Sequence, residues 1–101
     1  MADVPRVSLD DMDAGRARAL RLIAASLGGE RSELAAVIGE LANMESEARI
    51  VAAAALIENL TLFGELMARS AAAATGTEPL DMLSEFDTVI EKHEREDNDA
   101  G

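Results

Sequence analysis

The chain holds few side chains that could carry out covalent or acid–base chemistry. It has no cysteine and one histidine, His93, which stands between Lys92 and Glu94 in an acidic C-terminal run. A catalytic nucleophile needs a base beside it, and a lone histidine among charged residues is typical of a solvated surface. We therefore expect no catalytic residue and no enzymatic activity.

Residue spacing does not indicate a metal or cofactor site either. Helical proteins that bind iron use Glu-x-x-His on a helix, but here Ile90 stands three residues before His93. The Gly28-Gly29 pair follows a predicted helix, whereas phosphate-binding glycine loops follow a strand. We expect no metal and no cofactor.

Arg18 and Arg21 are the candidates for a phosphate-binding patch. They share one side of a predicted helix that also carries acidic residues one or two turns earlier. A helix-turn-helix would place residues 30–42 in the DNA major groove, but that segment holds three glutamates and one arginine. We expect an ion-paired solvent face and no binding to nucleic acid. The alternative is a small basic patch that receives the acidic tail or a partner protein.

The net charge of −11 is unevenly spread along the chain. Residues 1–31 hold five acidic residues and five arginines, whereas residues 32–101 hold fifteen acidic and four basic residues. Such a field repels nucleic acid and anionic membranes and favours basic partners. The longest uncharged run, Ile50–Ile57, is short of the ~20 residues of a membrane span. We expect a soluble, cytoplasmic protein with no membrane partner.

The pattern predicts an all-α protein of three to four helices. Ser8 is placed to cap a first helix that ends at Gly28-Gly29, and a second helix begins near residues 30–33. Either this helix stops near Asn43, or one helix runs from Glu30 to Ala74. We favour a break, because a helix of that length is rare in a small domain.

A long third helix over about residues 46–74 and a fourth with Pro79 in its first turn complete the prediction. We expect one helical domain over residues 1–92, an elongated bundle completed by homodimerisation. Residues 93–101 are charged and predict an acidic, disordered tail.

The third predicted helix is apolar around most of its circumference. A helix with one buried face shows an apolar stripe about 100° wide, and this one shows well over half its surface. It therefore needs cover from two sides, the second being another subunit; an elongated four-helix monomer is the alternative. The predicted dimer or partner interface consists of Leu56, Ile57, Leu60, Leu62, Phe63, Gly64, Leu66 and Met67.

Gly64 is unusual because it stands in the interior of this helix. Glycine costs a helix interior about 1 kcal/mol relative to alanine. Gly64 lies on one line with small residues such as Ala53 and Ala71, which would let another helix approach closely. The alternative is a tolerated glycine with no packing role.

Residues 68–86, ARSAAAATGTEPLDMLSEF, resemble the C-terminal part of uncharacterised small helical proteins of actinobacteria and their phages. In those proteins an alanine-rich helix is followed by Thr-Gly, a proline at a helix start and a leucine-rich last helix. The resemblance implies a helical fold and no activity.

The sequence thus predicts a non-enzymatic, acidic helical protein that acts through protein–protein contact, as a phage or accessory regulator or an assembly factor. Its partners would be a second copy and an unidentified, basic protein. Two alternatives are an acidic decoy that mimics DNA and an antitoxin-like protein that neutralises a basic protein.

Overall fold

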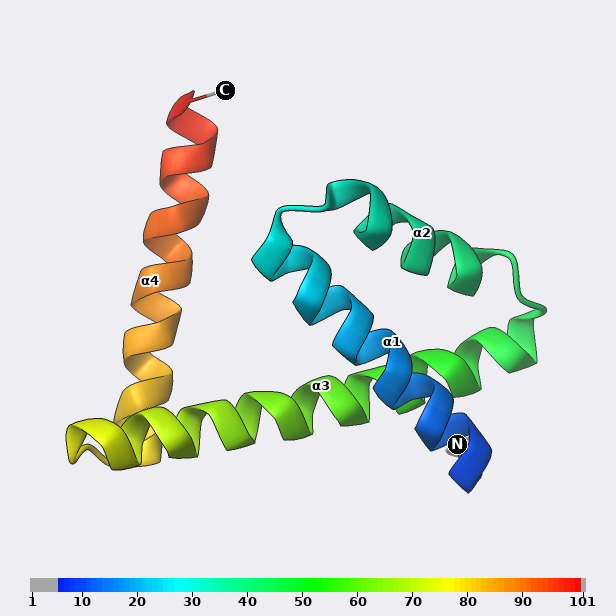
Figure 1. Cartoon of the computed structure of the whole chain (residues 1–101), viewed down its shortest axis with the longest axis horizontal. Helices are drawn as coiled ribbons and strands as arrows, with labels where there is room; N and C mark the ends of the chain where they lie inside the picture. Colours follow the sequence, from blue (N-terminus) through cyan, green and yellow to red (C-terminus); the bar gives the residue numbers. More distant parts are fainter. Residues whose placement is uncertain (1–5, 101) are drawn as a thin grey trace, which may run out of the picture. The chain divides into compact units, whose positions relative to one another are not determined.

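The computed structural model describes residues 6–100 of the chain, with side chains up to residue 97. In that range it contains four α-helices and no strand: α1 (Leu9–Gly28), α2 (Arg31–Ala42), α3 (Ser46–Thr75) and α4 (Pro79–Ala100) (Figure 1). The all-α class and the long apolar helix are thereby confirmed. The chain divides into two compact units, residues 1–62 and residues 63–101, where the sequence predicted one domain over residues 1–92. We call these the first unit and the second unit.

Helix α1 begins and ends at the signals read from the sequence. The Ser8 hydroxyl accepts a hydrogen bond from the Asp11 backbone N–H at 3.1 Å, and the Asp11 carboxylate accepts one from the Ser8 backbone N–H at 3.1 Å. This reciprocal capping box satisfies two N–H groups that have no partner inside the helix. At the other end, Gly29 takes a left-handed conformation with φ of 70°, which residues with a Cβ rarely adopt.

Helices α2 and α3 are separate, so the alternative of one helix from Glu30 to Ala74 is wrong. Helix α2 ends at Ala42, and α3 begins at Ser46 after three intervening residues. The Arg49 guanidinium donates hydrogen bonds to the carbonyl oxygens of Ala42 and Met44, at 3.1 and 2.9 Å. Arg49 therefore satisfies carbonyl groups that the end of α2 leaves without a helical partner.

Small residues dominate the core of the first unit. The buried apolar side chains are Ala19, Ala25, Val37, Ala52, Ala55 and Leu56, and the largest of them that is fully buried is Val37. Helix α1 crosses α3 where Gly15 faces Ala55. A Cβ built on Gly15 would lie only 2.8 Å from the backbone carbon and from the Cβ of Ala55. The absence of a side chain at Gly15 is what lets the two helices approach this closely.

The second unit contains the C-terminal part of α3, a turn at Gly76 and helix α4. Its buried apolar side chains are Ala68, Ala72 and Met82. Helix α4 begins at Pro79, as the sequence predicted. Two alanines and a methionine make a very small core, so most of the apolar surface of α4 stays exposed.

The sequence predicts an acidic, disordered tail over residues 93–101, and the structure places residues 93–100 in α4. Helix α4 continues through His93 to Ala100, and residue 101 lies outside the described range. Side chains one turn apart support this extension: Arg95 contacts Glu91 at 2.5 Å, and His93 lies 3.6 Å from Asp97. Such i,i+4 pairs stabilise the last turns of α4, whose side chains are charged or polar and bury no apolar surface.

By length and composition alone, α3 could cross a membrane, and it is the one helix within residues 6–100 of which this is true. Helix α3, Ser46–Thr75, is long enough to span a bilayer, whereas its longest uncharged run, Ile50–Ile57, is not. Its middle contains Glu58, Asn59 and Glu65, however, and ionisable residues at such positions are costly in a bilayer. The length and composition of α3 are equally those of a core helix that packs against other protein segments.

Candidate protein-binding interface

The part of the chain that the structure describes holds no cluster of side chains suited to a metal ion. Over that range, no group of three or more histidine, cysteine, aspartate or glutamate side chains could hold a metal ion. The His93 imidazole is well exposed, and its nearest charged partner is the Asp97 carboxylate at 3.6 Å.

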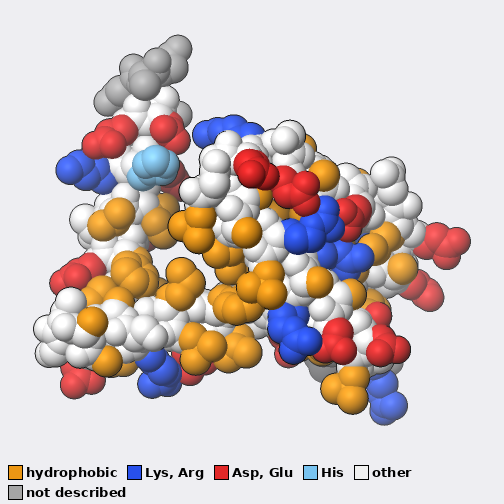
Figure 2. All heavy atoms as spheres, in the orientation of Figure 1, with side chains coloured by type: hydrophobic (Ala, Val, Ile, Leu, Met, Phe, Trp, Pro, Cys, Tyr) orange, Lys and Arg blue, Asp and Glu red, His pale blue; other side chains and the backbone are white. Residues whose placement is uncertain are grey.

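Arg18 and Arg21 pair with helix α2, where the sequence predicted pairing with acidic residues of their own helix. Arg21 binds the carboxylates of Glu33 and Glu40, each at 2.7 Å, and the Arg18 Nε lies 3.7 Å from Glu40. The hydrogen bond to Glu33 raises the pKa of the Arg21 guanidinium the most, and the hydrogen bond to Glu40 raises it further. Basic and acidic side chains lie beside one another over α1 and α2 (Figure 2). Arg18 and Arg21 thus connect α1 to α2. Because their charges are paired with carboxylates of α2, they argue against a basic patch that is available to a partner.

A groove of about 330 Å³ lies in the first unit between α1 and the start of α3. Its lining consists of Asp11, Ala14, Arg18, Met44, Glu47, Ala48, Val51 and Ala52. Arg18 contributes a buried Nε that makes no hydrogen bond, but its charge is balanced by Glu40. The remaining polar groups are the carboxylates of Asp11 and Glu47, and Asp11 already accepts the capping hydrogen bonds from Ser8. The groove therefore offers no convergent set of free polar groups for a small molecule.

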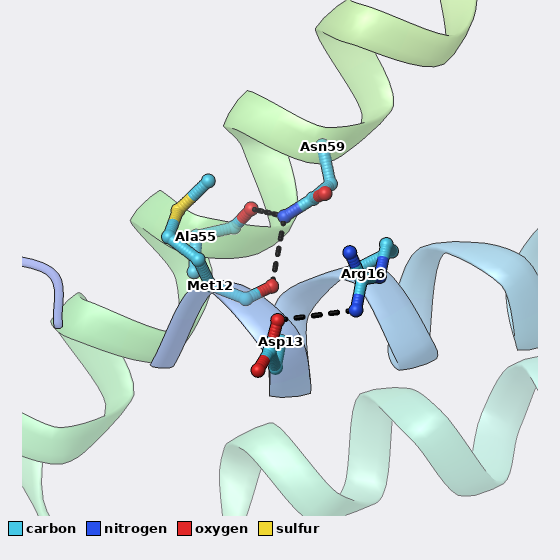
Figure 3. Close-up of polar contacts among 5 residues, drawn as sticks. All are labelled: Met12, Asp13, Arg16, Ala55 and Asn59. Carbon is cyan, nitrogen blue, oxygen red and sulfur yellow. Dashed lines mark hydrogen bonds and ion pairs between the residues drawn. The ribbon is translucent and has the colours of Figure 1, made fainter. Parts of the chain in front are cut away.

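Asn59 fixes how α3 packs on α1. It is the buried polar residue of the described core, and its side-chain amide donates to the carbonyl oxygens of Met12 at 3.2 Å and Ala55 at 2.9 Å (Figure 3). A buried amide is stable only when it is hydrogen-bonded. The face of α3 that carries Asn59, Ala52, Ala55 and Leu56 is therefore its inner face in the first unit.

The predicted interface residues divide between core and surface. Leu56 is only 8% exposed and belongs to the inner face of α3. In the first unit, Ile57 is 63% exposed, and Leu60 and Leu62 are also exposed.

In the second unit, Leu66 and Met67 are exposed, and Phe63 is half-buried. A Cβ built on Gly64 would meet no atom within 4 Å. No described part of the chain therefore packs closely against Gly64, and the role of Gly64 in an interface stays a prediction.

Four residues of the first unit form a continuous apolar line on α3, which we call the α3 seam: Ile50, Ala53, Ile57 and Leu60. Their spacing of three, four and three residues places them on one face, which adjoins the inner face of the helix at Leu56. Ile50, Ile57 and Leu60 are exposed, and Ala53 is half-buried. Ile50 was not among the predicted interface residues, although its position seven residues before Ile57 is the heptad signal that would have identified it.

Between residues 49 and 61, the positions that flank the α3 seam carry no acidic residue, and Glu47 lies on one edge, one turn before Ile50. In heptad terms they are Arg49 and Leu56 on one edge and Ala54 and Thr61 on the other. In this strongly acidic chain, the seam is thus an apolar line whose edges hold one carboxylate, that of Glu47 near its N-terminal end. Hydrophobic side chains at the surface of α3 are visible in Figure 2.

Comparison with known proteins places no relative beside these observations: no family model, no curated protein and no solved structure matches the chain.

Proposed function

We propose that this chain is a non-enzymatic protein that acts through protein–protein contact and forms a homodimer along the α3 seam. The observation that carries the proposal is the exposure of Ile50, Ile57 and Leu60 in a row. Large apolar side chains that gather on one exposed line mark an interaction surface, whereas single exposed ones do not.

A second copy of the chain suits this seam better than another occupant. Two copies related by a two-fold axis would pack Ile57 of one seam against the seam of the other. The net charge of −11 opposes association, but between residues 49 and 61 the flanking positions hold no carboxylate that would face its counterpart across the axis. The seam therefore lets two copies meet with little repulsion between carboxylates.

The test is the mass of the chain in solution. We expect light scattering to give close to twice the 10.7 kDa chain mass at micromolar concentration. Ile57→Asp places a charge in the middle of the seam and should shift the protein toward monomer.

Leu62→Asp is the matched control, because Leu62 is exposed on the same helix but lies off the seam. This variant should remain a dimer. A monomeric parent would overturn the dimer, and equal effects of the two substitutions would overturn the assignment of the seam.

A further inference from the structure

Helix α4 presents a second exposed apolar face, independent of α3. Met82, Leu83, Phe86, Val89 and Ile90 fall within about 120° of one another around the helix axis, given 3.6 residues per turn. We call these five residues the α4 stripe. Met82 is buried and Phe86 is half-buried, whereas Leu83, Val89 and Ile90 are each more than half exposed. The second unit therefore covers only the beginning of the stripe.

Carboxylates run along both edges of the α4 stripe. Asp87 and Glu94 follow one edge, and Glu85 and Glu96 follow the other; all four side chains are exposed. From residue 79 to residue 97 the helix holds seven acidic and two basic residues; Arg95 lies on the far side of the helix, and Lys92 lies beside Glu85 on one edge. This is an apolar face framed by negative charge, which the α3 seam is not.

The charge at the edges determines which occupant suits the stripe. A second copy of α4 would bring a mostly acidic face against its own copy, with Lys92 as the one base near an edge, and like charges across an interface disfavour association. A helix with an apolar face and lysine or arginine at its edges would bury Leu83, Val89 and Ile90 and pair with the flanking acids at once.

We propose that the α4 stripe docks a basic amphipathic helix of a partner protein. This deepens the proposed role in protein–protein contact by naming a partner class, but it uses a different helix from the α3 seam.

The probe for this site is a synthetic, fluorescein-labelled peptide of leucine and lysine, with leucines at helical spacing and lysines elsewhere. The chain has no tryptophan or tyrosine, so anisotropy of the label is the suitable readout. We expect saturable binding to the full-length protein. A peptide with glutamate in place of every lysine should not bind, and binding of both peptides alike would overturn the charge complementarity.

Two variants with the same added charge separate docking from general attraction to an acidic protein. Ile90→Asp interrupts the stripe, whereas Thr88→Asp adds the same charge at an exposed position on the far side of α4. We expect Ile90→Asp to weaken the peptide at least about tenfold, since a large apolar contact is lost. Thr88→Asp should leave binding unchanged or slightly tighter. Equal affinity of the two variants would mean that the stripe is not the docking site.

Other occupants of the stripe give different results with the same proteins. If a second copy covered the stripe, Ile90→Asp would convert dimer to monomer by light scattering. If another part of the chain covered it, Ile90→Asp would lower the melting temperature relative to Thr88→Asp. Either result would overturn the proposal. The Ile57→Asp protein should bind the lysine peptide as the parent does, so failure of the α3 dimer and failure of the α4 site are distinguishable.

Discussion

At the level of single residues, two helical glycines of the first unit have opposite surroundings. A Cβ on Gly15 would lie 2.8 Å from Ala55, whereas a Cβ on Gly39 would meet nothing within 4 Å. We expect Gly15→Ala to lower the free energy of unfolding by about 1–3 kcal/mol, because the α1–α3 crossing becomes overpacked. Gly39→Ala should raise it by up to about 1 kcal/mol through helix propensity. Urea unfolding followed by circular dichroism measures both, and a Gly15→Ala protein as stable as Gly39→Ala would contradict the close crossing.

Ser8 and Asp11 predict a pH dependence at the start of α1. The hydrogen bond from the Ser8 hydroxyl lowers the pKa of Asp11 the most, and the hydrogen bond from the Ser8 backbone N–H lowers it further, below its ordinary value of 3.8. A carboxyl whose pKa is lower in the folded state stabilises that state above the ordinary pKa, and this contribution is lost as the pH falls through the folded value. We expect Ser8→Ala to cost about 1 kcal/mol near neutral pH.

The cost of Ser8→Ala should shrink below pH 3.8, the ordinary pKa of the aspartate. Melting temperatures of parent and variant across the acidic range measure it. A gap that stays constant down to the lowest pH would show that the Asp11 carboxylate does not depend on the cap.

At the level of helices, Arg21 couples α1 to α2. It pairs with two carboxylates seven residues apart on α2, whereas Arg16 pairs with Asp13 of its own helix at 3.1 Å. We expect Arg21→Met to lower the melting temperature more than Arg16→Met. The difference should narrow at high salt, because ions screen partly exposed pairs. Equal melting temperatures of the two variants at low salt would mean that the pairing does not hold α2 in place.

The C-terminal turns of α4 should be helical yet unimportant for global stability. The side chains of residues 94–97 are all exposed, and exposed charges contribute little to folding. Removing residues 94–101 should change the free energy of unfolding by no more than about 0.5 kcal/mol. The circular dichroism signal of helix should nevertheless decrease in proportion to the residues removed. Unfolding on truncation would show that these turns are docked.

Local chemistry explains which helix boundaries could be predicted from the sequence. Ser8, Gly29 and Pro79 act on their own backbone or on residues a few positions away, so their effect can be read without the fold. The end of α4 had no such signal. Its polar residues were interpreted as a tail, although their i,i+4 spacing also suits a helix.

Packing could not be predicted in the same way, because it depends on which small residues allow a close approach. Leu9 and Leu27 belong to the apolar stripe of α1 by spacing, yet they are 85% and 86% exposed. The buried positions of α1 are Gly15, Ala19 and Ala25. For the same reason Leu56 was assigned to the interface and not to the core, since spacing alone does not tell the two sides of α3 apart.

At the level of the whole molecule, charge predicts that the protein does not bind nucleic acid. The net charge is −11, and Arg18 and Arg21 already face carboxylates of α2. We expect no shift of duplex DNA or RNA in a gel assay at physiological salt. A shift that disappears as salt is raised would show that the arginines of α1 are available to phosphate.

The hydrogen bonds of Asn59 have a consequence for how this sequence can vary. The acceptor on α1 is the main-chain carbonyl of residue 12, which every amino acid supplies. The hydrogen bond therefore fixes where α1 crosses α3, and it does not depend on which side chain stands at position 12. In a saturation library selected for folded protein, position 59 should retain asparagine, while position 12 should accept residues of similar size to methionine. The Asn59 side chain would then hold the α1–α3 crossing in place while the side chain at position 12 varies, whereas position 15 would remain glycine.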